Sequence, residues 1–129
     1  MSDVTSKPKR TWIRKFTGAF HGVAVGMRGQ SSFAVHLTFV LLVSSAGIVF
    51  RVALLEWCLL LLCMTLVLTS EMFNSALETL AKAIDRQHNP HLADGLDIAS
   101  GAVLLASLGA SIVGLIIFLN RAIAIWVGS

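Results

Sequence analysis

The chain has 129 residues, of which 56% are hydrophobic and only 13% are charged, and its formal net charge is +3 at pH 7. So little charge on so apolar a chain favours one membrane domain and excludes a pair of soluble domains. The weak positive charge suits an anionic lipid leaflet, and we do not expect nucleic acid as a partner.

The N-terminal segment is polar and basic. Residues 1–8 contain Pro8 with small and charged residues, and are predicted to form a disordered tail. Across 9–28, basic residues lie mostly off a stripe of apolar residues at helical spacing, which predicts an amphipathic helix on the membrane surface. The stripe consists of Trp12, Phe16, Ala19, Phe20 and Val23.

Three apolar stretches follow, and each spans or nearly spans a hydrocarbon core of about 30 Å. They predict transmembrane helices near 33–51, 53–84 and 92–126, within a single domain that covers 9–129. The second helix is expected to extend beyond the bilayer on its cytoplasmic side. Lys and Arg gather before the first span and between the second and third, which predicts a cytoplasmic N-terminus in the inner membrane. The expected fold class is all-α integral membrane.

A polar run follows the second apolar stretch directly. Glu71, Asn74 and Glu78 are spaced i, i+3 and i+7, so one face of a helix would carry all three. Two carboxylates and an amide on one stripe are typical of a divalent-metal or proton-transfer site at the membrane surface. The alternative is a solvated first turn after a membrane span, because polar residues are common there. The spacing alone leaves both interpretations open.

The start and the middle of the third span add further polar and small residues. Asp94 and Asp97 lie at its cytoplasmic start, near the depth expected for Glu78. Small residues then recur every four positions, a spacing that lets membrane helices approach closely and favours self-association, although such residues are also common in any membrane helix. These small residues are Ala102, Ala106, Ala110 and Gly114. The sequence has no Cys/His zinc spacing, no Gly-rich phosphate loop and no Ser-His-Asp order.

Two motifs together resemble the prokaryotic diacylglycerol kinase family, small integral-membrane lipid kinases that include undecaprenol kinases. The first motif runs from Glu71 to Glu78 (EMFNSALE) and the second from Leu96 to Val103 (LDIASGAV). The family pattern is Glu-x-x-Asn-[Ser/Thr]-Ala-[Ile/Leu]-Glu, then a polar loop, then Lys-Asp-x-[Ala/Gly]-[Ala/Ser]-[Gly/Ala]-Ala-Val. The resemblance extends over residues 10–120.

The resemblance implies a homotrimer of three-helix protomers, each with an N-terminal surface helix. It implies transfer of the γ-phosphate of ATP, bound with Mg²⁺, to the primary hydroxyl of a membrane lipid, either diacylglycerol or a polyprenol such as undecaprenol. Phosphoryl transfer needs positioning, charge neutralisation and a proton acceptor. The site implied for this chain has Glu71 as general base and Glu78 and Gln30 as metal ligands. The implied nucleotide contacts are Asn74, Asp97 and Lys82.

Four positions depart from the family pattern. Gln30 stands where the family has a second metal-binding Glu, and Leu96 replaces a Lys that faces the phosphates. Lys82 replaces an Asp, and Ala34 replaces an Arg found in many members. Gln30 can still coordinate through its carbonyl, while Lys82 either contacts a phosphate or pairs with Glu78 at i, i+4.

These departures keep a second function open, a family member with weakened catalysis that acts as a lipid- or nucleotide-binding membrane scaffold. The kinase is favoured by the retained residues Glu71, Asn74, Glu78 and Asp97. The scaffold is favoured by Gln30 in place of a metal-binding carboxylate and by Leu96 in place of a phosphate-facing Lys. A proton-coupled transporter is a third interpretation. It is disfavoured because the acids lie at the end of a span and not at its midplane.

Overall fold

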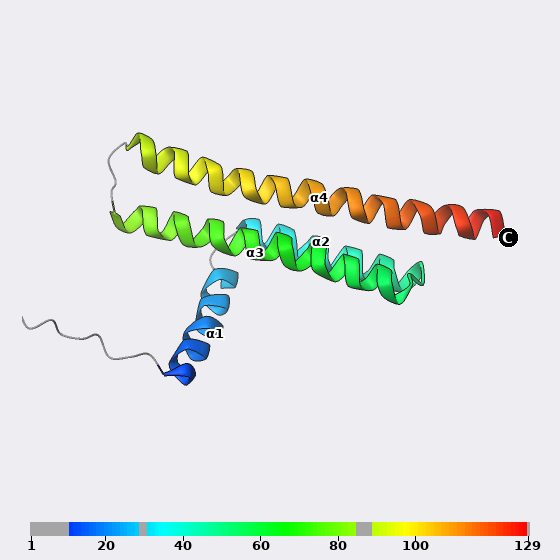
Figure 1. Cartoon of the computed structure of the whole chain (residues 1–129), viewed down its shortest axis with the longest axis horizontal. Helices are drawn as coiled ribbons and strands as arrows, with labels where there is room; N and C mark the ends of the chain where they lie inside the picture. The colour runs from blue at the N-terminus through cyan, green and yellow to red at the C-terminus, as the bar shows by residue number, and fades with distance from the viewer. Residues whose placement is uncertain (1–10, 29–30, 85–88, 129) are drawn as a thin grey trace, which may run out of the picture.

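The structure is a computed structural model that describes residues 11–28, 31–84 and 89–128. These residues form four helices, which are α1 (Trp12–Arg28), α2 (Ser31–Val49), α3 (Leu54–Ile84) and α4 (Pro90–Gly128). Helices α3 and α4 lie side by side and antiparallel, α2 folds back along α3, and α1 leaves the bundle at a steep angle (Figure 1). The all-helical prediction is confirmed, and the predicted tail at 1–8 lies outside the described residues.

Local signals account for where α3 and α4 begin. Asn89 caps α4, because its Oδ1 accepts a hydrogen bond from the backbone N–H of His91 at 3.0 Å. Pro90 then takes the first helical position, where its missing N–H has no partner to lose. At the start of α3, Oε1 of Glu56 accepts a hydrogen bond from the N–H of Ala53 at 2.9 Å, which is half of a capping box.

A tight turn joins α2 to α3. The N–H of Val52 donates to the carbonyl of Gly47 at 3.2 Å, and the N–H of Arg51 donates to the carbonyl of Ile48 at 3.3 Å. This pair of bonds is the Schellman pattern that ends a helix. Arg51 has a φ of 51°, a left-handed conformation that glycine usually takes. The predicted first span ran to residue 51, and the helix ends earlier, at Val49, because it cannot continue through this conformation.

A small apolar core lies at this turn end of the bundle, around residues 50–53. Val52, Leu60 and Ile117 are buried there. Gly47 brings α2 close to α3, since a Cβ atom at this position would come within 2.5 Å of the Trp57 ring. The core therefore holds all three long helices together at the turn end.

An ion pair reinforces the same end. Glu56 of α3 and Arg121 of α4 face each other, with Oε1 at 2.8 Å from Nη2 and 3.1 Å from Nε. Both side chains are half-buried, and each has the other as its counter-charge, so neither charge is left unpaired in an apolar setting. The pair ties α3 to α4 beyond what apolar packing provides.

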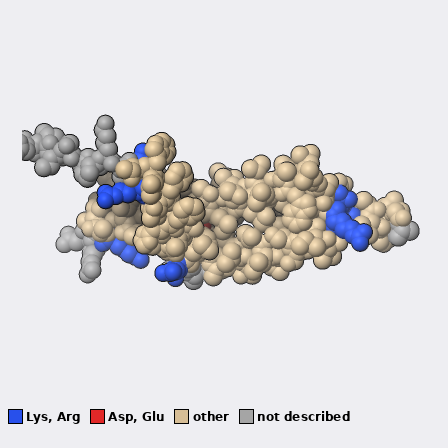
Figure 2. Space-filling model, turned by 90° about the horizontal axis from the view of Figure 1, so that it is seen from below, with Lys and Arg blue, Asp and Glu red and all other residues tan. Residues whose placement is uncertain are grey.

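The bundle has the surface of a membrane protein. Helices α3 and α4 are each long and apolar enough to span a membrane, and α1 with α2 passes the same test when the bent pair is taken together. Large apolar side chains cover the outside of α2, α3 and α4. In the face shown in Figure 2, Lys and Arg gather near the two ends, and an uncharged band lies between them. The helix predicted over 9–28 is observed as α1 (Trp12–Arg28), and none of its residues is buried.

Candidate active site

The second half of α3 buries polar side chains. Glu71 is 2% exposed, Asn74 is 8% exposed and Ser75 is 6% exposed. Because α3 continues unbroken to Ile84, the predicted spacing does place Glu71, Asn74 and Glu78 on one face. Nδ2 of Asn74 donates a hydrogen bond to Oε1 of Glu78 at 3.2 Å. The alternative of a solvated turn is wrong for the first two residues, since both are buried.

We define the polar cluster as Glu71, Asn74, Ser75 and Glu78. Two of its side-chain atoms have no hydrogen-bond partner in the described part of the chain. Within the described ranges, Oδ1 of Asn74 and Oγ of Ser75 are buried and make no hydrogen bond. A buried polar atom in that state costs about 1–3 kcal/mol. An amide oxygen beside a carboxylate is a donor set suited to a hard cation, which prefers oxygen ligands. The cluster therefore has two buried polar atoms to which a ligand could supply the missing contacts.

His36 of α2 also contacts the cluster, and sequence reasoning assigned it no role. Its Nε2 lies 3.3 Å from Oε2 of Glu71, and the two side chains are 17% and 3% exposed. A titratable side chain inside an apolar span usually has a specific partner, and this rule is the signal that could have singled out His36.

The other predicted site residues lie further from the cluster. Lys82 is exposed one turn beyond Glu78, and no ion pair joins these two side chains in the part of the chain described. Asp97 is exposed on α4. Glu78 and Asp97 both lie about 10 Å from the helix ends that face the α3–α4 connection, at 1.5 Å per residue. Their similarity in depth stays a prediction, and no hydrogen bond or ion pair between them is present among the described side chains.

Two further predictions concern metal binding. Gln30, the second predicted metal ligand, lies outside the described residues. Over 11–28, 31–84 and 89–128, no group of three or more His, Cys, Asp or Glu side chains converges in a way that would hold a metal ion. Of the predicted site residues on α3, Asn74 and Glu78 contact each other, through Nδ2 of Asn74 and Oε1 of Glu78.

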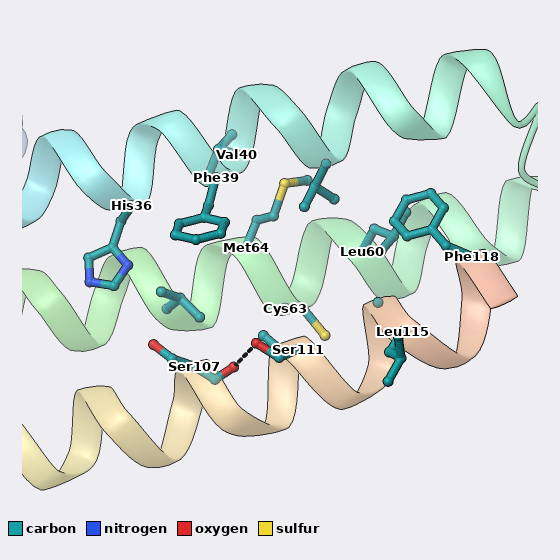
Figure 3. Close-up of a pocket in the computed structure, with 14 residues that line it drawn as sticks. His36, Phe39, Val40, Leu60, Cys63, Met64, Ser107, Ser111, Leu115 and Phe118 are labelled. Atoms are coloured by element: carbon teal, nitrogen blue, oxygen red, sulfur yellow. Dashed lines mark hydrogen bonds between the residues drawn. The ribbon is translucent and has the colours of Figure 1, made fainter.

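An apolar groove of about 510 Å³ leads away from the polar cluster. Helices α2, α3 and α4 all line it, with His36 and Ser107 toward one end and Leu115 and Phe118 toward the other (Figure 3). Most of its other lining side chains are apolar, and they include Val40. The shape and lining suit a hydrocarbon chain whose polar end lies at His36.

Comparison with known proteins identifies the family. The sequence model for prokaryotic diacylglycerol kinase matches residues 17–118, a range that contains α2, α3 and the polar cluster. An undecaprenol kinase from Bacillus subtilis (strain 168) is 27% identical over 110 residues, which is 85% of this chain and 89% of that protein. This chain belongs to the prokaryotic diacylglycerol kinase family.

Proposed function

We propose that this protein is a membrane lipid kinase that transfers the γ-phosphate of ATP to the primary hydroxyl of undecaprenol or of another lipid alcohol such as diacylglycerol. The observation that carries the proposal is the buried Glu71 carboxylate, in contact with a histidine that lines an apolar groove. Family membership supports the reaction class, and the similarity to an undecaprenol kinase supports a polyprenol as the alcohol.

Glu71 is the proposed general base. Its carboxylate accepts the proton of the lipid hydroxyl as the hydroxyl oxygen attacks the γ-phosphorus, and the bond from that phosphorus to the ADP oxygen breaks. The products are the lipid phosphate and ADP, and the proton later leaves Glu71 for solvent. Burial of the carboxylate helps to exclude water, which would otherwise compete as the nucleophile.

Mg²⁺ and ATP fit the donor set of the polar cluster. Glu78 offers a carboxylate and Asn74 offers a buried amide oxygen, and Mg²⁺ usually takes one or two carboxylates and completes its shell with phosphate oxygens and water. When bound, the ion neutralises charge on the phosphates. We assign Gln30 as an additional uncharged ligand, and Asp97 and Lys82 as contacts of the nucleotide.

We further propose a homotrimer in the inner membrane with the N-terminus in the cytoplasm. Apolar side chains that are exposed in the single chain would pack against lipid or a neighbouring copy, and small residues on α4 allow close helix contact. The spanning helices and the family fit an inner membrane. The placement of Lys and Arg supports the orientation.

A scaffold with weakened catalysis is the second candidate. Leu96 stands where the family has a phosphate-facing Lys, and its half-buried apolar side chain offers no charge to the transferring group. Such a protein would bind lipid or nucleotide without phosphorylating the lipid.

One assay separates the two functions. The purified protein in lipid nanodiscs is given labelled ATP, Mg²⁺ and either undecaprenol or diacylglycerol, and the lipid fraction is assayed for label. A kinase transfers label to at least one lipid, and the label is lost without Mg²⁺. Binding of ATP or lipid without any transfer would reject the kinase in favour of the scaffold.

A further inference from the structure

The contact between His36 and Glu71 joins the apolar groove to the polar cluster. Nε2 of the imidazole lies 3.3 Å from Oε2 of the carboxylate, and both side chains are largely removed from solvent. Figure 3 shows the His36 ring near one end of the groove, on the helix that faces α3. One side chain therefore touches the acid and also borders the space that suits a hydrocarbon chain.

Hydrogen-bond chemistry sets the direction of this contact. A carboxylate oxygen without a hydrogen only accepts hydrogen bonds, so a hydrogen bond across this contact requires Nε2 of His36 to carry the hydrogen and donate it to Glu71. A glutamate side chain rotates about several bonds, and a directional donor restricts the orientations that its carboxylate takes. Because Glu71 is buried, a hydrogen bond across this 3.3 Å contact would be electrostatically stronger than the same bond in water.

We propose that His36 is a positioning residue for lipid phosphorylation, whose Nε2–H holds the Glu71 carboxylate in the orientation that accepts the proton of the lipid hydroxyl. This inference rests on the kinase function proposed above. His36 keeps its own hydrogen throughout. The lipid O–H proton passes to Glu71, the lipid oxygen bonds to phosphorus, and the electron pair of the broken P–O bond remains with ADP.

A purely structural role for His36 makes different predictions. A histidine in an apolar span needs a partner whatever the protein does. If His36 is only structural, its substitution lowers the fraction of folded protein. If His36 positions Glu71, its substitution lowers kcat in the folded protein and leaves the KM for MgATP unchanged. Glutamine separates the two cases, because its side-chain amide can donate from a place similar to Nε2 without the ring.

The experiment compares folded variants of the full chain in nanodiscs that contain undecaprenol. We expect His36→Leu to lower kcat by about 100-fold, the loss that a misplaced catalytic group can cause. The KM for MgATP should stay within about twofold of wild type, and His36→Gln should recover most of the lost kcat. The matched control is Leu41→Ala, also on α2 but 63% exposed and outside the groove lining, which should leave kcat within about twofold of wild type.

Two results would overturn the inference. One is a wild-type kcat for His36→Leu, and the other is a His36→Gln variant as slow as His36→Leu although both melt at the wild-type temperature. If the leucine variant does not fold, His36→Gln is compared with His36→Asn, whose shorter amide does not reach Glu71, and equal kcat values then overturn the inference. Inactivity of the wild-type protein toward every lipid alcohol removes the kinase function itself, whereas an active wild type that is insensitive at His36 removes only the positioning role.

Discussion

Glu56 and Glu71 are two carboxylates on the same helix, and their surroundings differ in kind. Glu56 has a permanent cation, Arg121, at 2.8 Å and a backbone N–H at 2.9 Å. Glu71 is more deeply buried, faces the imidazole of His36, and has the partnerless Oδ1 of Asn74 on the same helix face. A carboxylate matched by a fixed cation contributes to structure. We place the proposed chemistry at the other carboxylate, which lies among polar atoms that make no hydrogen bond within the described residues.

The sharpest way to test this contrast is to remove the charge of Glu71. Glu71→Gln should abolish lipid phosphorylation, because the proton acceptor is lost, and an acid–base group contributes about 10²- to 10⁴-fold to rate. The amide is close in size to the carboxylate, so the fold and MgATP binding should survive. The measurements are labelled-lipid formation, nucleotide affinity and melting temperature. Turnover near the wild-type level would remove Glu71 from the base role.

A double substitution toward the family pattern addresses the residues that depart from it. Gln30→Glu with Leu96→Lys should raise kcat or lower the Mg²⁺ requirement, by up to about 100-fold for the restored donor. The new carboxylate attracts the metal, and the new ammonium offsets charge on the transferring phosphoryl group. If an inactive wild type becomes active, the scaffold function is correct for the natural chain. If an active wild type is unaffected, other groups have replaced both, and Lys82 is the first candidate.

Glu78 should respond differently from Glu71. Glu78→Gln keeps an oxygen ligand but removes its charge, so we expect the Mg²⁺ concentration for half-maximal activity to rise about tenfold, with most of kcat recovered at saturating metal. A Mg²⁺ titration of lipid phosphorylation measures this. An unchanged half-maximal concentration would show that Glu78 does not bind the metal, and Leu80→Ala serves as an exposed control on the same helix.

Substitutions in the Glu56–Arg121 pair at the turn end should lower the melting temperature more than they lower kcat. Arg121→Leu leaves Glu56 without its cation, and the melting temperature should fall by a few degrees. The double variant Glu56→Gln with Arg121→Leu should recover part of that loss, because no unpaired charge remains. Thermal melts and kcat of the folded fraction are compared for both variants. A drop in kcat with no change in melting temperature would contradict the division between the two carboxylates.

Most of the fold followed from the apolar runs. The helix predicted over 53–84 is observed as Leu54–Ile84. Its long apolar run is followed by good helix formers, and no Gly or Pro interrupts the segment. The helix predicted from residue 92 begins at Pro90, since the Asn-Pro cap places its start two residues earlier. The end of α2 was misjudged because a left-handed Arg51 carries no signal in the sequence, as a glycine would have.

The site was only partly predictable, for a geometric reason. Residues on one helix have their relative positions fixed by the 3.6-residue period, so Glu71, Asn74 and Glu78 could be grouped in advance. The partnership of His36 with Glu71 depends on how α2 is rotated about its own axis against α3. Lipid-facing and protein-facing sides are both apolar in a membrane helix, so the sequence pattern does not specify that rotation.

The ion pair at the turn end has a mechanical consequence for the other end of the bundle. Glu56 lies 15 positions before Glu71, about 22 Å along α3 at 1.5 Å per residue. Apolar faces rich in small residues allow two helices to slide past each other, and one turn of slippage is about 5.4 Å. The Glu56–Arg121 pair adds a directional contact to the apolar packing between α3 and α4, and this contact favours one axial register of the two helices and with it one level of Asp97 relative to Glu78.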